Sequence, residues 1–88
     1  MASLLSLWVS SKSPYDPRPA LKGKEIIRAL ERAGFRIDRI RGSHVFLEHP
    51  SGKATSVPIH SREIVGPGLF RAILRDVEMT LEEFIELL

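Results

Sequence analysis

The sequence of 88 residues contains no cysteine, and it has only one tryptophan and one tyrosine. The lack of cysteine excludes disulfide bonds, zinc sites built on thiolates and cysteine nucleophiles, and it fits a reducing compartment. No run of residues approaches the roughly 20 apolar positions that a membrane-spanning helix needs. The apolar start of the chain also lacks the preceding positive charge of a secretory signal. We therefore expect a cytoplasmic protein without a membrane partner.

The length predicts a single domain, because most domains contain roughly 100–200 residues. With 43% hydrophobic and 27% charged residues, the composition is that of a globular protein and excludes a disordered one. Residues 1–20 are expected to form an N-terminal extension in which Leu4, Leu7 and Trp8 pack on the domain or on a partner. Pro14, Pro17 and Pro19 make residues 13–20 a stiff linker, and residues 21–88 form the domain.

Charge is distributed unevenly along the chain, although the formal net charge is only +2. Residues 18–62 hold ten Lys and Arg against four Asp and Glu, whereas residues 63–88 hold two against six. Nine of the thirteen cationic residues are arginine, the residue best suited to forked contacts with phosphate. This pattern is typical of a polyanion-binding protein, but solvated helix faces produce it too.

A helix is predicted over residues 22–33, where apolar side chains recur at helical spacing and charged residues fill the other positions. The apolar stripe consists of Leu21, Ile26, Ile27, Leu30 and Ala33. Gly34 is expected to end the helix in a left-handed conformation.

Strands are predicted after Gly34, because the hydrophobic period drops to two from Phe35. The second strand is expected over residues 43–49 and the third over residues 54–59. The turn at Arg41–Gly42 separates the first two strands, and Pro50–Lys53 has the residues of a hairpin turn.

Two short helices are predicted at the end of the chain. Pro67 suits the first turn of one, which carries Leu69, Phe70, Ile73 and Leu74 at helical spacing. Thr80 and Glu83 have the spacing of a capping box at the start of the other. The order helix, three antiparallel strands, two helices predicts a two-layer α+β fold with the helices on one face of the sheet.

Strict alternation along the strands predicts which side chains face the helices and which face solvent. The helix-covered face would carry Phe35, Ile37, Val45, Leu47, Val57 and Ile59. The open face would carry Arg36, Asp38, Ile40, His44, Phe46, Glu48 and Ser56. His44 is the candidate for proton transfer there, since imidazole titrates near neutral pH. The nearby Arg36, Arg39 and Arg41 are candidates for holding a phosphate.

Several short motifs, read together, resemble the HicA toxin family of toxin–antitoxin systems. They are Lys24–Ile27, Ala33–Phe35, Arg41–His44, His49–Gly52, Val57–His60, Glu63–Ile64 and Leu81–Phe84. The resemblance covers residues 22–88, and its most specific parts are Gly42–Ser43–His44 and the Val-Pro-x-His block that ends at His60. Residues 1–20 and the run Gly66–Gly68 depart from the family pattern.

The resemblance implies a fold like that of double-stranded-RNA-binding domains and a ribosome-independent mRNA endonuclease without a cofactor. It maps the single catalytic histidine onto His44 and implies inhibition by a HicB antitoxin. The same fold used only to bind RNA is one alternative, and a protein-interaction domain is another.

The residues alone suggest further contacts around His44. Gly42 forms the turn and leaves room for a backbone to approach, while Ser43 either caps that turn or contacts RNA. Phe46 is placed to stack on a base or to meet the antitoxin, and His60 to line the same groove as His44.

Two mechanisms remain open for such a site. His44 would serve as general base or acid in attack by the neighbouring 2′-hydroxyl, or it would activate a water for direct hydrolysis. Alternation along the strand places His49 on the face opposite to His44, so we expect it to have a structural role. A metal site is not expected, because the spacing of the three histidines matches no ligand pattern.

Overall fold

The computed structural model describes residues 18–60 and 63–88. The predicted packing of Leu4, Leu7 and Trp8, and the predicted linker up to Pro17, fall outside the described residues. The elements, in order, are α2 (Gly23–Arg32), β1 (Arg36–Arg41), β2 (His44–Glu48), β3 (Ala54–Pro58), α3 (Pro67–Asp76) and α4 (Leu81–Ile85).

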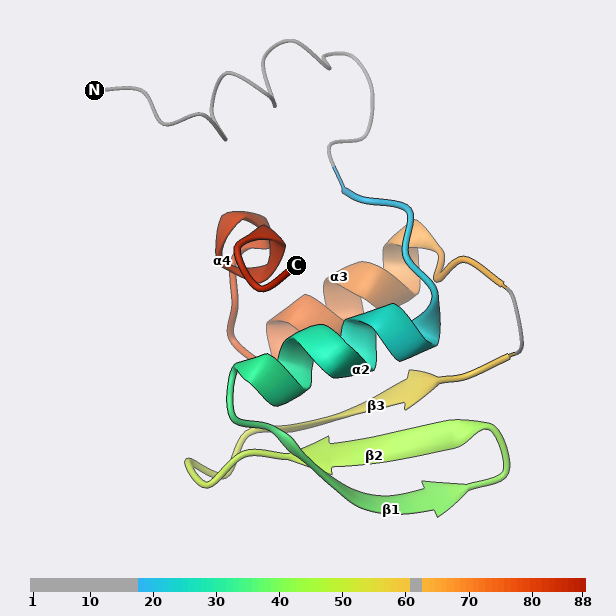
Figure 1. The fold of residues 1–88 in the computed structure, drawn as a ribbon, viewed down its shortest axis with the longest axis vertical. Helices are drawn as coiled ribbons and strands as arrows, with labels where there is room; N and C mark the ends of the chain where they lie inside the picture. The colour runs from blue at the N-terminus through green and yellow to red at the C-terminus, as the bar shows by residue number, and fades with distance from the viewer. Residues whose placement is uncertain (1–17, 61–62) are drawn as a thin grey trace, which may run out of the picture.

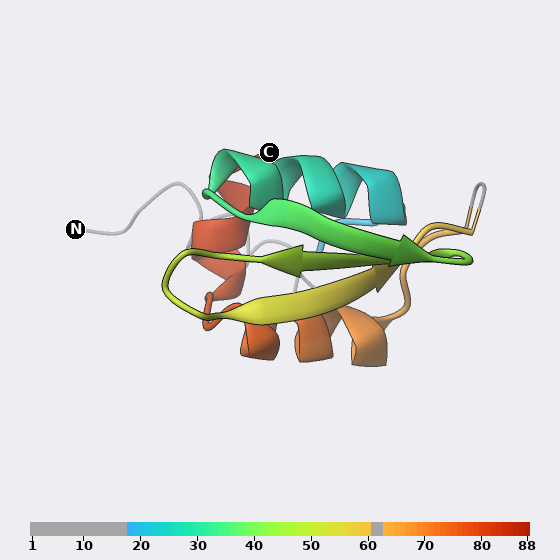
Figure 2. The same cartoon turned by 90° about the horizontal axis from the view of Figure 1, so that it is seen from below.

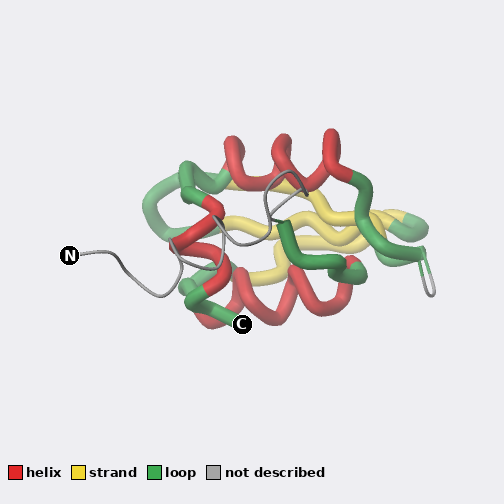
Figure 3. Tube along the Cα trace, turned by 90° about the horizontal axis from the view of Figure 1, so that it is seen from above, coloured by secondary structure: helices red, strands yellow, loops and turns green. Residues whose placement is uncertain are grey.

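The three described strands form one antiparallel sheet in the order β1-β2-β3. Helices α2 and α3 lie side by side on one face of this sheet (Figures 2 and 3). No described helix or strand covers the other face, which we call the open face. Short α4 lies on the side of α2 and α3 that faces away from the sheet (Figure 1). The predicted α+β arrangement is confirmed.

Helix α2 follows from its apolar stripe and its two ends. Leu21, Ile26, Ile27 and Leu30 are buried, and full burial of such a side chain stabilises the fold by about 1.5–3 kcal/mol. At the start, the Lys22 N–H donates to the Glu25 carboxylate at 2.9 Å. At the end, Gly34 takes the predicted positive φ, +100°.

The capping box predicted for the last helix is also present. The Thr80 hydroxyl accepts the Glu83 N–H at 3.1 Å, and the Glu83 carboxylate accepts the Thr80 N–H at 2.9 Å. The hydrogen bond from the Thr80 N–H, and after it the Thr80 side chain, lower the pKa of the exposed Glu83 carboxyl. Buried Phe84 meets the Phe70 ring edge-on at 5.3 Å, and Arg32 donates to the Leu87 carbonyl at 2.7 Å.

Strand β1 departs from the strict alternation that the sequence predicts. Ile37 pairs with Leu47, but the next pair is Arg39 with Phe46, so the register shifts between Ile37 and Arg39. This β-bulge reverses the parity of the rest of the strand. Ile40 therefore shares the face of its partner Val45. The prediction that Ile40 lies on the open face is wrong. This side chain sits at the sheet edge, where it is 57% exposed.

The bulge has a second consequence, which concerns the arginines. Arg39 shares the face of Phe46, and Arg41 shares the face of His44, because directly paired residues point the same way. Arg36, paired with Glu48 before the bulge, is on that face already. All three arginines of β1 therefore belong to the open face.

Candidate functional site

His44 is the first residue of β2 and follows directly on the Gly42–Ser43 turn. Its side chain is exposed, and its cross-strand neighbours are Arg41 in β1 and Pro58 in β3. Neither ring nitrogen has a hydrogen-bond partner within the described residues. The imidazole is therefore free to exchange a proton with a bound molecule.

The turn before His44 depends on a glycine. Gly42 has φ +57°, in the left-handed region that glycine adopts without steric cost. A Cβ at this position would meet no atom within 4 Å. The conformation of the turn, and not close packing, therefore explains the glycine, and the space outside the turn is open.

The open face beside His44 is cationic and carries one aromatic ring. The Arg39 guanidinium lies over the Phe46 ring, 4.4 Å from its centroid, and also pairs with the Asp38 carboxylate at 2.9 Å. A guanidinium stacked in this way extends the flat surface on which a base can rest. Arg41 lies next to His44, and Arg36 lies at the far end of the same strand.

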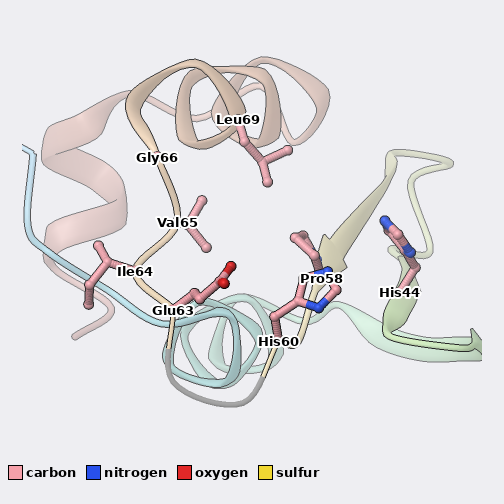
Figure 4. A pocket seen from close by; sticks show the side chains of 8 residues that line it. All are labelled: His44, Pro58, His60, Glu63, Ile64, Val65, Gly66 and Leu69. Carbon is pink, nitrogen blue, oxygen red and sulfur yellow. The ribbon is translucent and has the colours of Figure 1, made fainter.

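A groove of about 310 Å³ begins at His44 and runs toward the start of α3 (Figure 4). His60 lies in this groove, and its ring centroid is 6.4 Å from that of His44, with the ring planes nearly perpendicular at 84°. The His60 Nε2 is 3.3 Å from the Ser43 Oγ. The structure thus brings His60, Ser43 and His44 together from two separate segments of the chain.

Backbone pairing holds the segment that carries His60. The Ile59 N–H donates to the Ser43 carbonyl at 2.6 Å, which fixes the chain just before His60. In the segment that resumes at Glu63, Ile64 pairs with Lys22, and the Val65 N–H donates to the Leu21 carbonyl at 2.8 Å. The far wall of the groove is therefore anchored to the residues that precede α2.

Helix α2 also supports the groove through a close contact. Gly23 abuts the end of β3, where a Cβ would overlap the carbonyl oxygen of Pro58. Only glycine fits there without a shift of the backbone. This contact ties the helix layer to the strand end that leads into His60.

The walls of the groove contain residues for which the sequence predicted no role. They are largely apolar, with one carboxylate, and consist of Pro58, Glu63, Ile64, Val65, Gly66 and Leu69. Leu69 was expected in the apolar stripe of a helix, but it is 40% exposed and faces the groove. Its helical spacing alone gave no sign of this. Glu63–Ile64 occurs among the family-like motifs, which is the one signal in the sequence for that wall.

His49 occupies a different environment at the opposite end of β2. Its Nδ1 accepts the Ser51 N–H at 3.0 Å and lies 2.8 Å from the Ser51 Oγ. Its ring is 5.0 Å from that of Phe35. This histidine is engaged by the hairpin turn.

Within residues 18–60 and 63–88, no cluster of three or more His, Asp or Glu side chains is arranged to hold a metal ion. No helix in these ranges has the length and apolar character required to cross a membrane.

Comparison with known proteins bears on the whole arrangement. Residues 23–79 match the family model described as the HicA toxin of bacterial toxin–antitoxin systems. No curated protein matches the chain. The matched segment runs from the start of α2 past the end of α3 and contains His44, His60 and the entire sheet. It covers more than half of the sequence, and the chain therefore belongs to the HicA toxin family.

Proposed function

We propose that this chain is the toxin of a HicA/HicB-type pair and an endoribonuclease that cleaves cytoplasmic mRNA, with His44 as its catalytic residue. The observation that supports this most strongly is the exposed imidazole, which lies beside the arginine-bearing open face and has no hydrogen-bond partner among residues 18–60 and 63–88. Family membership supports the toxin role, and the chemistry of RNA supports the reaction.

RNA suits a site with few reactive groups, because its 2′-hydroxyl supplies the nucleophile. His44 would accept the 2′-proton as general base while Arg41 offsets the charge that develops on the phosphate. A positioned general base contributes typically about 10²–10⁴-fold to the rate. The enzyme is therefore expected to be slow, which is sufficient for a toxin that stops growth.

The substrate would be held mainly through its phosphates. Arg36, Arg39 and Arg41 provide three guanidinium groups along one strand, and the Gly42–Ser43 turn provides backbone donors next to His44. Phe46, with Arg39 on its ring, would carry a base. Binding should weaken steeply with salt, since each neutralised phosphate releases counterions.

The test separates binding from cleavage. Purified wild-type protein, His44→Ala and the control His49→Asn are each incubated with RNA, and cleavage and affinity are measured in parallel. We expect His44→Ala to bind RNA like the wild type and to leave it uncut, while His49→Asn cuts normally. Cleavage by His44→Ala at the wild-type rate would overturn the catalytic assignment. Binding without cleavage by the wild type would indicate an RNA-binding module.

The partner of this toxin would be a HicB-type antitoxin that covers the open face and buries His44. An acidic partner surface is expected there, because opposite charge accelerates association. Arg36→Glu combined with Arg41→Glu should slow association with the antitoxin strongly, and Arg75→Glu on α3 should not. Equal association rates for both variants would exclude the open face as the interface.

A further inference from the structure

The groove beside His44 contains a second imidazole that is also available for proton transfer. His60 is exposed, and only one of its ring nitrogens, Nε2, is engaged, by the Ser43 hydroxyl at 3.3 Å. Its Nδ1 has no hydrogen-bond partner within the described residues. When one nitrogen is held and the other is free, the ring has a fixed orientation and one atom left for chemistry.

The separation of the two rings fits a shared substrate group. A hydrogen bond between two imidazoles would bring their nitrogens to about 3 Å. The centroid distance of 6.4 Å is too long for that, yet both rings line the same groove. A single phosphodiester group between them would be within reach of both.

The surroundings of the groove suggest how the two rings divide the work. His44 borders the arginine face, whereas His60 lies among apolar walls that enclose about 310 Å³, at the lower end of the range for ligand pockets. The apolar walls around His60 suit the nucleoside that leaves after cleavage. Among the described residues, Arg41 pairs with His44 across the strands, and Glu63 lines the groove and donates its N–H to the His60 carbonyl at 2.9 Å. Arg18 lies behind the wall and donates to the Val65 carbonyl.

We propose that His60 is a second catalytic residue, the general acid that protonates the leaving 5′-oxygen, and that Ser43 positions its ring. This inference rests on the proposed RNA cleavage at His44. His44 removes the 2′-proton, the 2′-oxygen attacks phosphorus, and the bond from phosphorus to the 5′-oxygen breaks. The His60 imidazolium gives its proton to that oxygen. The products are a 2′,3′-cyclic phosphate and a 5′-hydroxyl, and water restores both protonation states.

The experiment uses one short RNA that contains a mapped cut site, in two versions. In the second version, sulfur replaces the bridging 5′-oxygen, so the leaving group is a thiolate. Thiols are far more acidic than alcohols, with a pKa of about 8.5 for cysteine, and a thiolate departs without a proton donor. The full-length wild type, His60→Gln, His44→Ala and the control His49→Asn are compared on both RNAs. Gln is chosen because its terminal amide can keep the contact with Ser43 but cannot transfer a proton.

We expect His60→Gln to lose about 10²–10⁴-fold in rate on ordinary RNA and to recover most of this loss on the sulfur-containing RNA. His44→Ala should remain inactive on both. The wild-type rate should rise and then fall with pH, and His60→Gln should lack the fall, because an acid works only while it is protonated. Ser43→Ala should lose less activity than His60→Gln and keep both limbs of the profile.

Three results would overturn the role of His60. They are wild-type activity of His60→Gln on ordinary RNA, equal loss on both RNAs, and recovery of His44→Ala instead of His60→Gln on the sulfur-containing RNA. Wild-type activity of His44→Ala on both RNAs would instead refute the proposed function, so the two failures are distinguishable. A circular dichroism spectrum of each variant controls for folding, and the exposed position of His60 predicts no change.

Discussion

His44 begins strand β2 and His49 directly follows its last residue, and the two side chains have different surroundings. At one end His44 is exposed, lies next to Arg41 and has no hydrogen-bond partner in the part of the chain that the structure describes; its ring centroid is 6.4 Å from that of His60. At the other end His49 is engaged by Ser51 and lies against Phe35. The difference shows that the partners of the imidazole, and not its presence in a strand, decide whether it is available for chemistry. We call these the His44 end and the His49 end of the sheet.

The largest contrast between the ends is expected in cells. Expression of the chain without its antitoxin should arrest growth, and His44→Asn should abolish the arrest, because loss of a general base removes about 10²–10⁴-fold of the rate. His49→Asn should arrest growth like the wild type. Colony counts after induction measure this effect, with protein levels compared by immunoblot. Survival of cells that express His49→Asn at the wild-type level would contradict the predicted difference between the two ends.

For stability the order should be reversed, with the larger loss at the His49 end. His49→Ala removes hydrogen bonds to Ser51 and a ring contact with Phe35, and it should lower the free energy of unfolding by about 1–2 kcal/mol. His44→Ala removes an exposed, unpartnered side chain and should change it by less than about 0.5 kcal/mol. Urea unfolding measures both. A greater loss for His44→Ala would show that His44 has a structural role.

The glycines in the turns at the two ends should also differ in how much their substitution lowers stability. Gly42 at the His44 end has φ +57°, a value that asparagine also adopts, whereas Gly52 at the His49 end has φ +98°. Gly42→Asn should therefore cost well under the roughly 1–2 kcal/mol that a left-handed conformation costs other residues. Gly52→Asn should cost more than Gly42→Asn in the same urea experiment. Equal costs would mean that the turn conformations are not what selects glycine.

A smaller effect is expected from single arginines. Arg39→Gln should weaken RNA binding modestly and reduce the slope of log affinity against log salt by about one. Arg75→Gln, an exposed change on α3 in the helix layer, should leave the slope unchanged. Affinity measured at several salt concentrations checks this, and equal slopes for both variants would contradict a role for the open face.

The smallest effect concerns Glu83 in the capping box of α4. Hydrogen bonds from Thr80 lower the pKa of this carboxyl, so its ionised form stabilises the fold. That contribution is complete above the ordinary pKa of a glutamate and disappears as the pH falls through the lowered value. Glu83→Gln should therefore flatten the loss of thermal stability on acidification slightly. An unchanged acid profile would show that the cap does not depend on charge.

Much of the fold could be predicted because its signals are local. The stripe of α2, the end of that helix at Gly34 and the capping box at Thr80 each depend on residues within one or two helical turns. The bulge in β1 could not be predicted in this way. Register depends on pairing across strands, and a shift of one residue reverses every following side chain. As a result, alternation placed Ile40 on the open face, and Arg39 and Arg41 reach that face only through the bulge.

In the candidate site too, the local features could be predicted from the sequence and the long-range ones could not. His44 and its turn are adjacent in the sequence, so their exposure at a hairpin could be anticipated. The geometry of His60 depends on a segment paired with Leu21 and Lys22, about forty residues earlier in the chain. No local pattern encodes that pairing, and for the same reason Leu69 and Glu63 were not recognised as parts of the groove.

The most direct test of the account is an NMR titration of the histidine rings. The chain has only three histidines, so each ring signal can be assigned from the spectra of three single substitutions. The RNA carries a 2′-O-methyl group at the cut site, which leaves it bound and uncut. We predict that the signals of His44 and His60 move as RNA is added and that the signal of His49 does not. A fixed His44 signal at saturating RNA, or a shift confined to His49, would contradict the account.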